Sequence, residues 1–298
     1  MSEKQRVLFG TAGWSYDDWK GVFYPAKPGR FDFLRFAAEH FDVLEVNSTF
    51  YRPPTSKMAR SWARRTADLE GFEFTAKLHR RFTHHRDEPW RPVEADAYKR
   101  GIDPLAEAGR LGGILVQFPW SFKNVPENRK WLGALVEEFG EYPLFIEVRH
   151  NSWADDAFFN YLDENGVGFV DVDQPLFGGS LPPTERATGG RGYVRLHGQN
   201  KAKWFKEDAQ AWERYDYLYS EDELSKWVKK IRDLSKKSEK VFVINNNHYR
   251  GQAAANSLEL KSLLTGERVA VPPELLASYP RLSKIARPPE GESQGRLL

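Results

Sequence analysis

The chain has 298 residues, of which 40% are hydrophobic, and its 44 basic and 42 acidic side chains leave a net charge of +2. This near balance gives no bulk signal for nucleic-acid binding, which would require a local basic patch. The sequence has no cysteine, which excludes disulfides, thiolate metal sites and cysteine nucleophiles and favours a cytoplasmic location. It has no signal-peptide pattern and no apolar run of membrane-spanning length, so we expect no membrane association.

Eight short apolar runs alternate with segments whose apolar residues have helical spacing. The predicted strands are residues 7–13, 43–49, 72–79, 113–119, 144–149, 168–173, 192–198 and 240–246. The predicted helices are residues 31–41, 56–66, 94–110, 128–139, 155–164, 220–238, 252–264 and 272–279. We expect Pro104 to start or break the third helix, Ser220 to cap the sixth and Gly266 to end the seventh.

Eight strands alternating with helices predict an α/β fold, a single (β/α)8 TIM-type barrel over residues 1–285 with a flexible tail at 286–298. Residues 174–190 are rich in Gly and Pro, so a long loop is expected in place of a regular helix after strand six. A doubly wound open sheet is the alternative. It is disfavoured because its strands would be apolar on both faces and because no Gly-x-Gly-x-x-Gly follows the first strand.

One face of each predicted strand becomes polar towards its C-terminal end, where barrel enzymes keep their sites. Alternation along the strands predicts an inward set, with Asn246 on the opposite phase: Thr11, Glu45, Asn47, Thr49, Lys77, His79, Gln117, Glu147, Arg149, Asp171, Asp173, Arg195, His197, Asn245 and Asn247. A buried polar group without a partner costs about 1–3 kcal/mol. These side chains must therefore pair with each other, with water or with a ligand.

The inward set supports two interpretations, a substrate site and an internal salt-bridge network. As a site, it offers general acids and bases, and Glu147 and Asp171 on neighbouring strands could form such a pair. The predicted catalytic residues are Glu147, Asp171, Asp173 and His197. The predicted substrate-binding residues, with the arginines and the lysine holding an anion, are Trp14, Tyr16, Asn47, Lys77, Arg149, Arg195 and Asn245.

The first hypothesis is an enzyme acting on a small polar anionic or phosphorylated substrate, with hydrolysis preferred to isomerisation. No cofactor is assigned. His79, Glu147, Asp173 and His197 offer metal donors, but no spaced ligand motif such as His-Glu-x-x-His occurs, so no metal site is predicted. A non-catalytic metabolite-binding barrel is a further alternative. Neither the substrate nor the oligomeric state follows from the sequence.

A second hypothesis is a nucleic-acid-processing or single-strand-binding protein. Trp204 and Phe205, with Lys201, Lys203 and Lys206, could line a basic aromatic groove, although a solvated loop is the preferred interpretation of this segment. The loop segment Thr83-His84-His85-Arg86 could also reach a substrate, but exposed His pairs on loops are usually inert.

The motifs along the chain resemble those of the YecE-like family, which is defined by domain of unknown function 72. The matching segments are Gly10-Thr11-Ala12-Gly13-Trp14-Ser15-Tyr16, Phe23-Tyr24-Pro25, Glu45-Val46-Asn47-Ser48-Thr49-Phe50-Tyr51, Phe74-Thr75-Ala76-Lys77, Thr83-His84, Gln117-Phe118-Pro119, Glu147-Val148-Arg149, Ser152-Trp153, Arg195-Leu196-His197-Gly198, Asn245-Asn246 and Gly251-Gln252-Ala253. The resemblance covers almost the whole chain and implies a TIM-type barrel. It supplies no function, because the family has no established one.

Overall fold

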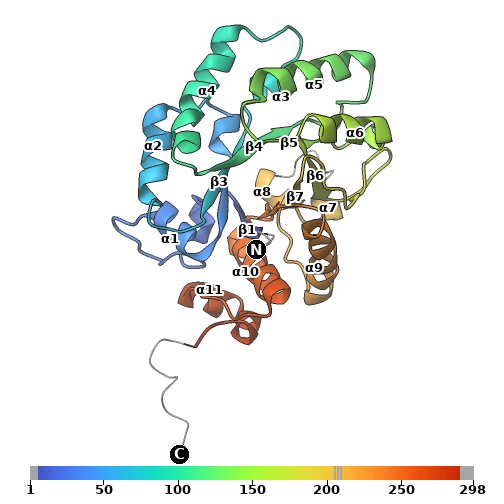
Figure 1. Cartoon of the computed structure of the whole chain (residues 1–298). Coiled ribbons are helices and arrows are strands. Elements are labelled where there is room, and N and C mark those ends of the chain that lie inside the picture. The colour runs from blue at the N-terminus through green and yellow to red at the C-terminus, as the bar shows by residue number, and fades with distance from the viewer. Residues whose placement is uncertain (1–5, 205, 207, 209, 289–298) are drawn as a thin grey trace, which may run out of the picture.

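The strands form a closed parallel barrel in which each strand pairs with the next and β8 pairs with β1. The computed structural model describes residues 6–204, 206, 208 and 210–288. The strands are β1 (Arg6–Ala12), β2 (Val43–Val46), β3 (Glu73–Lys77), β4 (Leu111–Gln117), β5 (Leu144–Glu147), β6 (Gly168–Asp173), β7 (Arg191–Leu196) and β8 (Lys240–Asn245). The predicted TIM barrel is confirmed, and Figure 1 shows the helices arranged around it.

The longer helices follow the predicted pattern. The helices are α1 (Phe33–His40), α2 (Ser56–Arg65), α3 (Arg80–Thr83), α4 (Pro92–Glu107), α5 (Pro126–Phe139), α6 (Asp156–Glu164), α7 (Lys201–Trp204), α8 (Ala211–Arg214), α9 (Glu221–Ser235), α10 (Gln252–Thr265) and α11 (Pro273–Ser278). The short helices α3, α7 and α8 were not predicted. Residues 174–190 are all described and contain no helix, as expected.

Local sequence signals correctly place the start of α9 and the end of α10. The Ser220 hydroxyl accepts from the Glu223 amide at 3.3 Å, and the Ser220 amide donates to the Glu223 carboxylate at 2.9 Å, so α9 begins with a reciprocal cap. Gly266 ends α10 with φ of 73°. The prediction for Pro104 is wrong, because α4 continues through it. The Arg100 carbonyl, which loses its helical donor to this proline, accepts from the Ser56 hydroxyl at 2.7 Å instead.

The predicted tail lies largely outside the described residues. Ala286 still pairs with Val269, and the Arg287 amide donates to the Val269 carbonyl at 2.8 Å. Ordered contacts therefore extend beyond the expected start of the tail. Within the described residues, no helix is both long enough and apolar enough to cross a membrane.

Side-chain alternation corrects the inward set on three strands. The inner core contains Leu8, Ala12, Val170, Val172, Phe242 and Ile244. The predicted inward orientation is wrong for four residues, because they alternate with these core residues along β1, β6 and β8 and so face outwards: Thr11, Asp171, Asp173 and Asn245. On β6 the outer face is polar because the long loop covers it: both the amide and the hydroxyl of Thr184 donate to Asp171.

Candidate functional site

Two carboxylates and one arginine form a buried polar layer below the C-terminal mouth of the barrel. The Arg195 guanidinium on β7 binds Glu45 on β2 in a bidentate manner, with Nη2–Oε1 at 2.7 Å and Nε–Oε2 at 3.0 Å. Arg195 Nη1 lies 2.6 Å from Glu147 Oε2 on β5. Tyr193 donates to Glu45 at 2.7 Å, and its hydroxyl lies 2.9 Å from that of Thr75. Every charge of this layer is therefore paired.

Arg149 and His197 lie just beyond the ends of β5 and β7, one layer closer to the mouth. Arg149 Nε and Nη2 donate to Glu147 Oε1 at 2.9 and 2.7 Å, and its side chain keeps 15% of its surface exposed. Burial alone would raise the pKa of Glu147, but the charges of Arg195 and Arg149 outweigh it and hold that pKa well below its usual range. Glu147 is thus a permanently ionised partner of two arginines and not a general acid.

The imidazole of His197 is neutral. Burial, followed by the charges of Arg195 and Arg149, holds its pKa well below the usual value. Its Nε2 lies 3.4 Å from Arg149 Nη2 and 3.5 Å from Arg195 Nη1, so Nε2 faces two donors. His197 Nδ1 lies 2.7 Å from Nδ2 of the Asn246 side chain.

Lys77 is the last residue of β3 and completes what we call the mouth cluster, Glu45, Lys77, Glu147, Arg149, Arg195 and His197. Its ammonium group lies 4.0 Å from the centroid of the Phe50 ring. Among the described residues it has no ion pair and no side-chain hydrogen bond. Burial, followed by the charge of Arg195, lowers the pKa of Lys77 to about 7. The amine is therefore divided between its charged and neutral forms near neutral pH.

Aromatic rings continue from His197 around the mouth, and we call Tyr16, Trp204, Tyr215 and His248 the aromatic wall. The rings of Trp204 and Tyr215 lie 6.1 and 5.9 Å from His197. His248 lies 5.2 Å from Tyr215 and stacks on Tyr16 at 4.5 Å. These rings are partly exposed, so the wall offers flat apolar surface beside the charged cluster.

The structure brings part of the predicted site together. The mouth cluster includes five of the predicted residues: Lys77, Glu147, Arg149, Arg195 and His197. Tyr16 belongs to the aromatic wall. Asn47 directly follows β2 and hydrogen-bonds Tyr16 through its side chain, beside the cluster. Sequence reasoning missed Asn246, Tyr193, Tyr215 and His248, and it dismissed His84. Burial, followed by the charges of Lys77 and Arg149, lowers the pKa of His84 to about 4.

Four predicted residues lie elsewhere. Asp171 accepts from Thr184 and from the Glu185 amide in the long loop, at distances of 2.7 to 3.1 Å. Asp173 accepts from Tyr219 and Gln199, both at 2.5 Å. Asn245 shares the register of Thr11 and Leu196, so its side chain points to the outer layer. Trp14 packs in that layer against Trp62 and Phe74, with centroids 6.1 and 6.2 Å away.

These positions separate Glu147 from Asp171, so the suggested general acid–base pair does not exist. Burial raises the pKa of both Asp171 and Asp173, but each is held by loop or helix-side donors outside the barrel. Across the described residues, no group of three or more His, Asp or Glu side chains is arranged to hold a metal ion.

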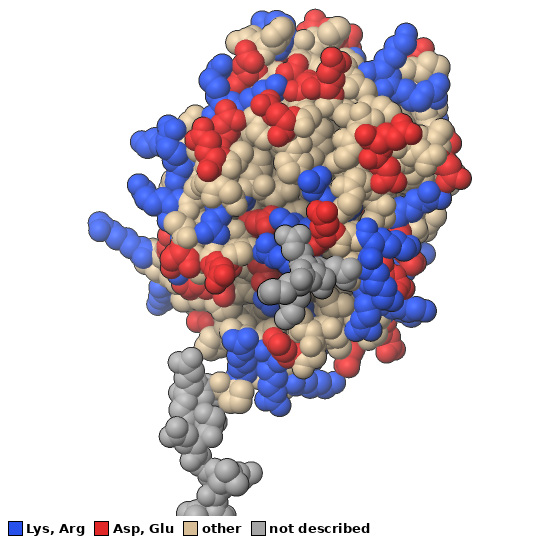
Figure 2. All heavy atoms as spheres, viewed as in Figure 1, with Lys and Arg blue, Asp and Glu red and all other residues tan. Residues whose placement is uncertain are grey.

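In the basic segment after β7, two of the three lysines have their charges offset. Lys203 pairs with Glu213 at 2.6 Å and Lys206 with Asp208 at 3.2 Å. Phe205, the other aromatic residue of the suggested groove, lies outside the described residues. Figure 2 shows Lys and Arg intermingled with Asp and Glu over the face that it presents. Neither observation favours an extended basic groove.

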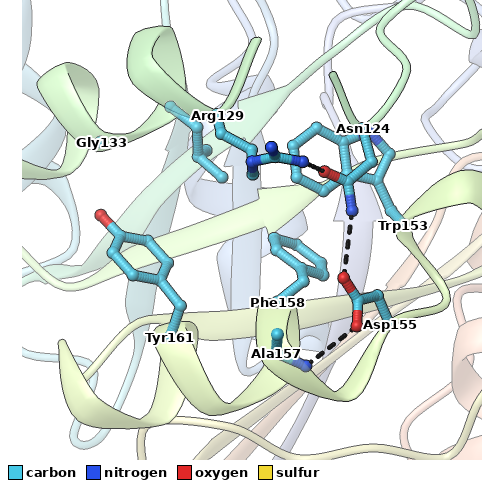
Figure 3. Close-up of a pocket in the computed structure, with 9 residues that line it drawn as sticks. Asn124, Arg129, Gly133, Trp153, Asp155, Ala157, Phe158 and Tyr161 are labelled. Atoms are coloured by element: carbon cyan, nitrogen blue, oxygen red, sulfur yellow. Dashed lines mark hydrogen bonds between the residues drawn. The ribbon is translucent and has the colours of Figure 1, made fainter. Parts of the chain in front are cut away.

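A separate cavity of about 190 Å³ lies outside the barrel, between α5 and α6 (Figure 3). Trp153 and Phe158 are among the apolar residues that line it. Its polar groups are engaged with each other: Arg129 donates to Asn124 at 2.9 Å, and the Asn124 amide lies 3.4 Å from Asp155. The Ala157 amide donates to the other Asp155 oxygen at 3.1 Å. Few polar groups remain here to orient a ligand, so the mouth cluster is the better candidate site.

Comparison with known proteins gives one consistent result. Residues 8–280 match the family described as protein of unknown function DUF72. The UPF0759 protein YunF of Bacillus subtilis is 31% identical over 283 residues, which cover 91% of this chain and 99% of that protein. A DUF72 family protein of Thermotoga maritima is 36% identical with a TM-score of 0.75, over 87% of this chain and 98% of the other.

A DUF72 family protein of Enterococcus faecalis superposes with a TM-score of 0.77 at 25% identity, over 90% of this chain and 98% of that one. The agreement extends over nearly the full length of each relative, and the matched residues include the four strands that carry the mouth cluster, β2, β3, β5 and β7. The chain therefore belongs to the DUF72 family of TIM-barrel proteins.

Proposed function

We propose that this protein is an enzyme that binds a small anionic substrate, such as a phosphorylated or carboxylated metabolite, at the C-terminal mouth of its barrel. One observation carries the proposal. The mouth cluster contains three cationic side chains, Lys77, Arg149 and Arg195, but only two carboxylates, Glu45 and Glu147. When Lys77 is protonated, the cluster holds one positive charge that no carboxylate balances, and an anion would supply the missing charge.

The position of each cation supports the same proposal. Arg195 is fully occupied by Glu45 and Glu147, so it serves to hold the layer together. Arg149 uses Nε and Nη2 on Glu147 but remains partly exposed, and its Nη1 has no hydrogen-bond partner among the described residues. Arg149 and Lys77 are therefore the two groups available to an anion, with Arg149 suited to oxygens of a phosphate or carboxylate.

The chemistry that this site can perform differs from the acid–base scheme expected from the sequence. Glu147 stays ionised, and Asp171 and Asp173 lie outside the barrel. Lys77, with its pKa of about 7, is the group in the mouth that can take up or release a proton near neutral pH. We therefore assign proton transfer to Lys77 and substrate orientation to Arg149.

Sulfate binding tests the proposal, because sulfate keeps its charge between pH 5 and pH 9. Sulfate should raise the melting temperature of the wild type by mass action on the folded state, and more strongly below pH 7, where Lys77 is protonated. Arg149→Ala should lose this response while remaining folded. Lys99→Ala is the matched control, since Lys99 is a partly exposed cation paired with Glu138 and Glu141. An equal sulfate response in the wild type and in Arg149→Ala would rule the site out.

A further inference from the structure

We infer that Lys77 is an amine nucleophile that forms a Schiff base with an aldehyde or ketone group of the substrate, while the anionic group of the same molecule binds Arg149. This inference rests on the anion site proposed above, and it adds the substrate class: a small carbonyl compound that carries a carboxylate or phosphate.

The surroundings of Lys77 are those that activate a lysine. The ammonium group lies over the Phe50 ring at 4.0 Å, and no carboxylate among the described residues lies within ion-pair distance of it. The charges of Arg195, on β7, and of Arg149, just beyond β5, disfavour the protonation of Lys77. The charges of Glu147 and Glu45 favour it. Burial combined with neighbouring cations is the general way in which proteins generate a nucleophilic amine, whereas the cation–π contact with Phe50 by itself favours the charged form.

The remaining titratable neighbours do not replace Lys77 in this role. Lys77 and its neighbours His84 and His197 influence one another electrostatically, and the pKa of each imidazole is lowered by burial and by nearby cations. Both imidazoles are therefore neutral near pH 7 and add no charge. At that pH about half of Lys77 is neutral, whereas for an ordinary lysine the neutral fraction is on the order of one in a thousand.

A partly exposed lysine that is held by two carboxylates shows the contrast. Lys99 on α4 lies 3.0 Å from Glu138 and 2.9 Å from Glu141. Burial lowers its pKa, but the bonds to these two carboxylates outweigh burial, and the net pKa of Lys99 is raised. Lys99 is therefore a protonated, non-nucleophilic amine, and it provides an internal reference within the same molecule.

The reaction balances without an oxidant or a reductant. Lys77 Nζ forms a bond to the carbonyl carbon, the carbon–oxygen double bond breaks, and the oxygen leaves as water with two protons from the ammonium group. The resulting iminium carries the same single positive charge as the ammonium that it replaces. The charge of the mouth cluster is therefore unchanged by the bond, and the substrate anion on Arg149 offsets it as in the non-covalent complex.

Reductive trapping of the full-length protein tests the inference. The probe is glyoxylate, a small aldehyde that carries a carboxylate, with cyanoborohydride at pH 7, and labelled residues are identified by peptide mass mapping. Lys77 should be labelled at least about tenfold faster than Lys99, because its neutral fraction is far larger. The rate at Lys77 should rise through pH 7, and Lys77→Met should remove the fast phase of labelling.

A neutral aldehyde separates the two proposals. With propionaldehyde the preference for Lys77 should persist but the rate should fall, and Arg149→Ala should lower the glyoxylate rate to that of propionaldehyde. The Schiff-base inference alone would be overturned if the label spread evenly over Lys77, Lys99 and other lysines while the protein still responded to sulfate through Arg149. Fast labelling of Lys77 by both aldehydes at the same rate, without a sulfate response, would instead overturn the anion site on which it rests.

Discussion

Replacing Glu147 with Gln tests how the mouth cluster is held together. The Glu147 side chain has 0% exposure and accepts three charge-assisted hydrogen bonds from Arg149 and Arg195, at 2.6 to 2.9 Å. Gln has nearly the same shape, but it carries no charge, and its NH2 group would face a guanidinium donor in either orientation. Arg195 would keep its pair with Glu45, whereas Arg149 would lose the carboxylate that it binds.

The expected cost follows from this geometry. Removing one partner of a buried ion pair costs about 3–5 kcal/mol, because the charge that remains is buried without compensation. This is a large part of the roughly 5–15 kcal/mol that stabilises a typical folded protein. We therefore expect Glu147→Gln to lower the free energy of unfolding by about 3–5 kcal/mol at pH 7. Urea unfolding followed by tryptophan fluorescence measures this difference, since the chain contains 10 Trp.

The pH dependence of the stability difference is an independent test of the same prediction. Because the folded-state pKa of Glu147 lies below its usual value, its contribution to stability is complete above about pH 4.5, the ordinary glutamate pKa. The contribution is lost as the pH falls below that value towards the folded-state pKa. The difference between the wild type and Glu147→Gln should therefore shrink in acid, below about pH 4.5.

Glu141→Gln is the matched control. Glu141 pairs with Lys99 at 2.9 Å, but its side chain is 57% exposed, so its loss should cost less than about 1 kcal/mol. The double variant Glu147→Gln/Arg149→Met should lose less stability than the sum of the two single variants, because the two side chains interact directly. If Glu147→Gln costs no more than Glu141→Gln, the cluster is not a structural support, and our interpretation of Glu147 is refuted.

Two further predictions concern groups that the structure reassigns. Asp171→Asn should leave the sulfate response and Lys77 labelling unchanged, because Asp171 faces the long loop. Burial raises the pKa of Asp171, so the charge on Asp171 costs stability as the pH rises above 3.8. Asp171→Asn should therefore be at least as stable as the wild type at pH 7. A loss of the sulfate response in this variant would contradict the placement of Asp171 outside the barrel. Lys77→Met should stabilise the protein most below pH 7, because the wild type must hold a charged, buried amine there. The stability advantage of the variant should vanish towards pH 10.5. Urea unfolding across this pH range measures the difference. Parallel stability profiles for Lys77→Met and the wild type would show that the Lys77 pKa is not lowered.

The barrel and much of its inner lining can be predicted from the sequence. Eight strand-like runs alternating with helical ones specify the (β/α)8 order, because hydrophobic periodicity is a local property of the chain. The same period of two correctly turned Glu45, Lys77, Glu147 and Arg195 inwards. Reciprocal capping at Ser220 likewise follows from residues three positions apart.

Tertiary structure decided the orientation of strands whose two faces are both polar at the C-terminal end. On β6 the sequence offered Asp171 and Asp173 without showing that residues from the long loop and from α9's N-terminal side would supply their donors. On β8 Asn245 and Asn246 were equally polar, and only the closed register showed that Asn246 meets His197. Alternation reveals that two faces exist, but it cannot say which one is inside when distant segments hydrogen-bond the outer face.

Tertiary structure also decided which charges meet. Arg195 and Glu45 are 150 residues apart in sequence, on β7 and β2, which are not neighbours in the barrel, yet they form a bidentate pair across its interior. The lowered pKa of Lys77 has the same origin, since burial and the charge of Arg195 exist only once the barrel has closed. The types of residue in the mouth are therefore a property of the sequence. Their pairing and protonation depend on distances that the closed barrel alone creates.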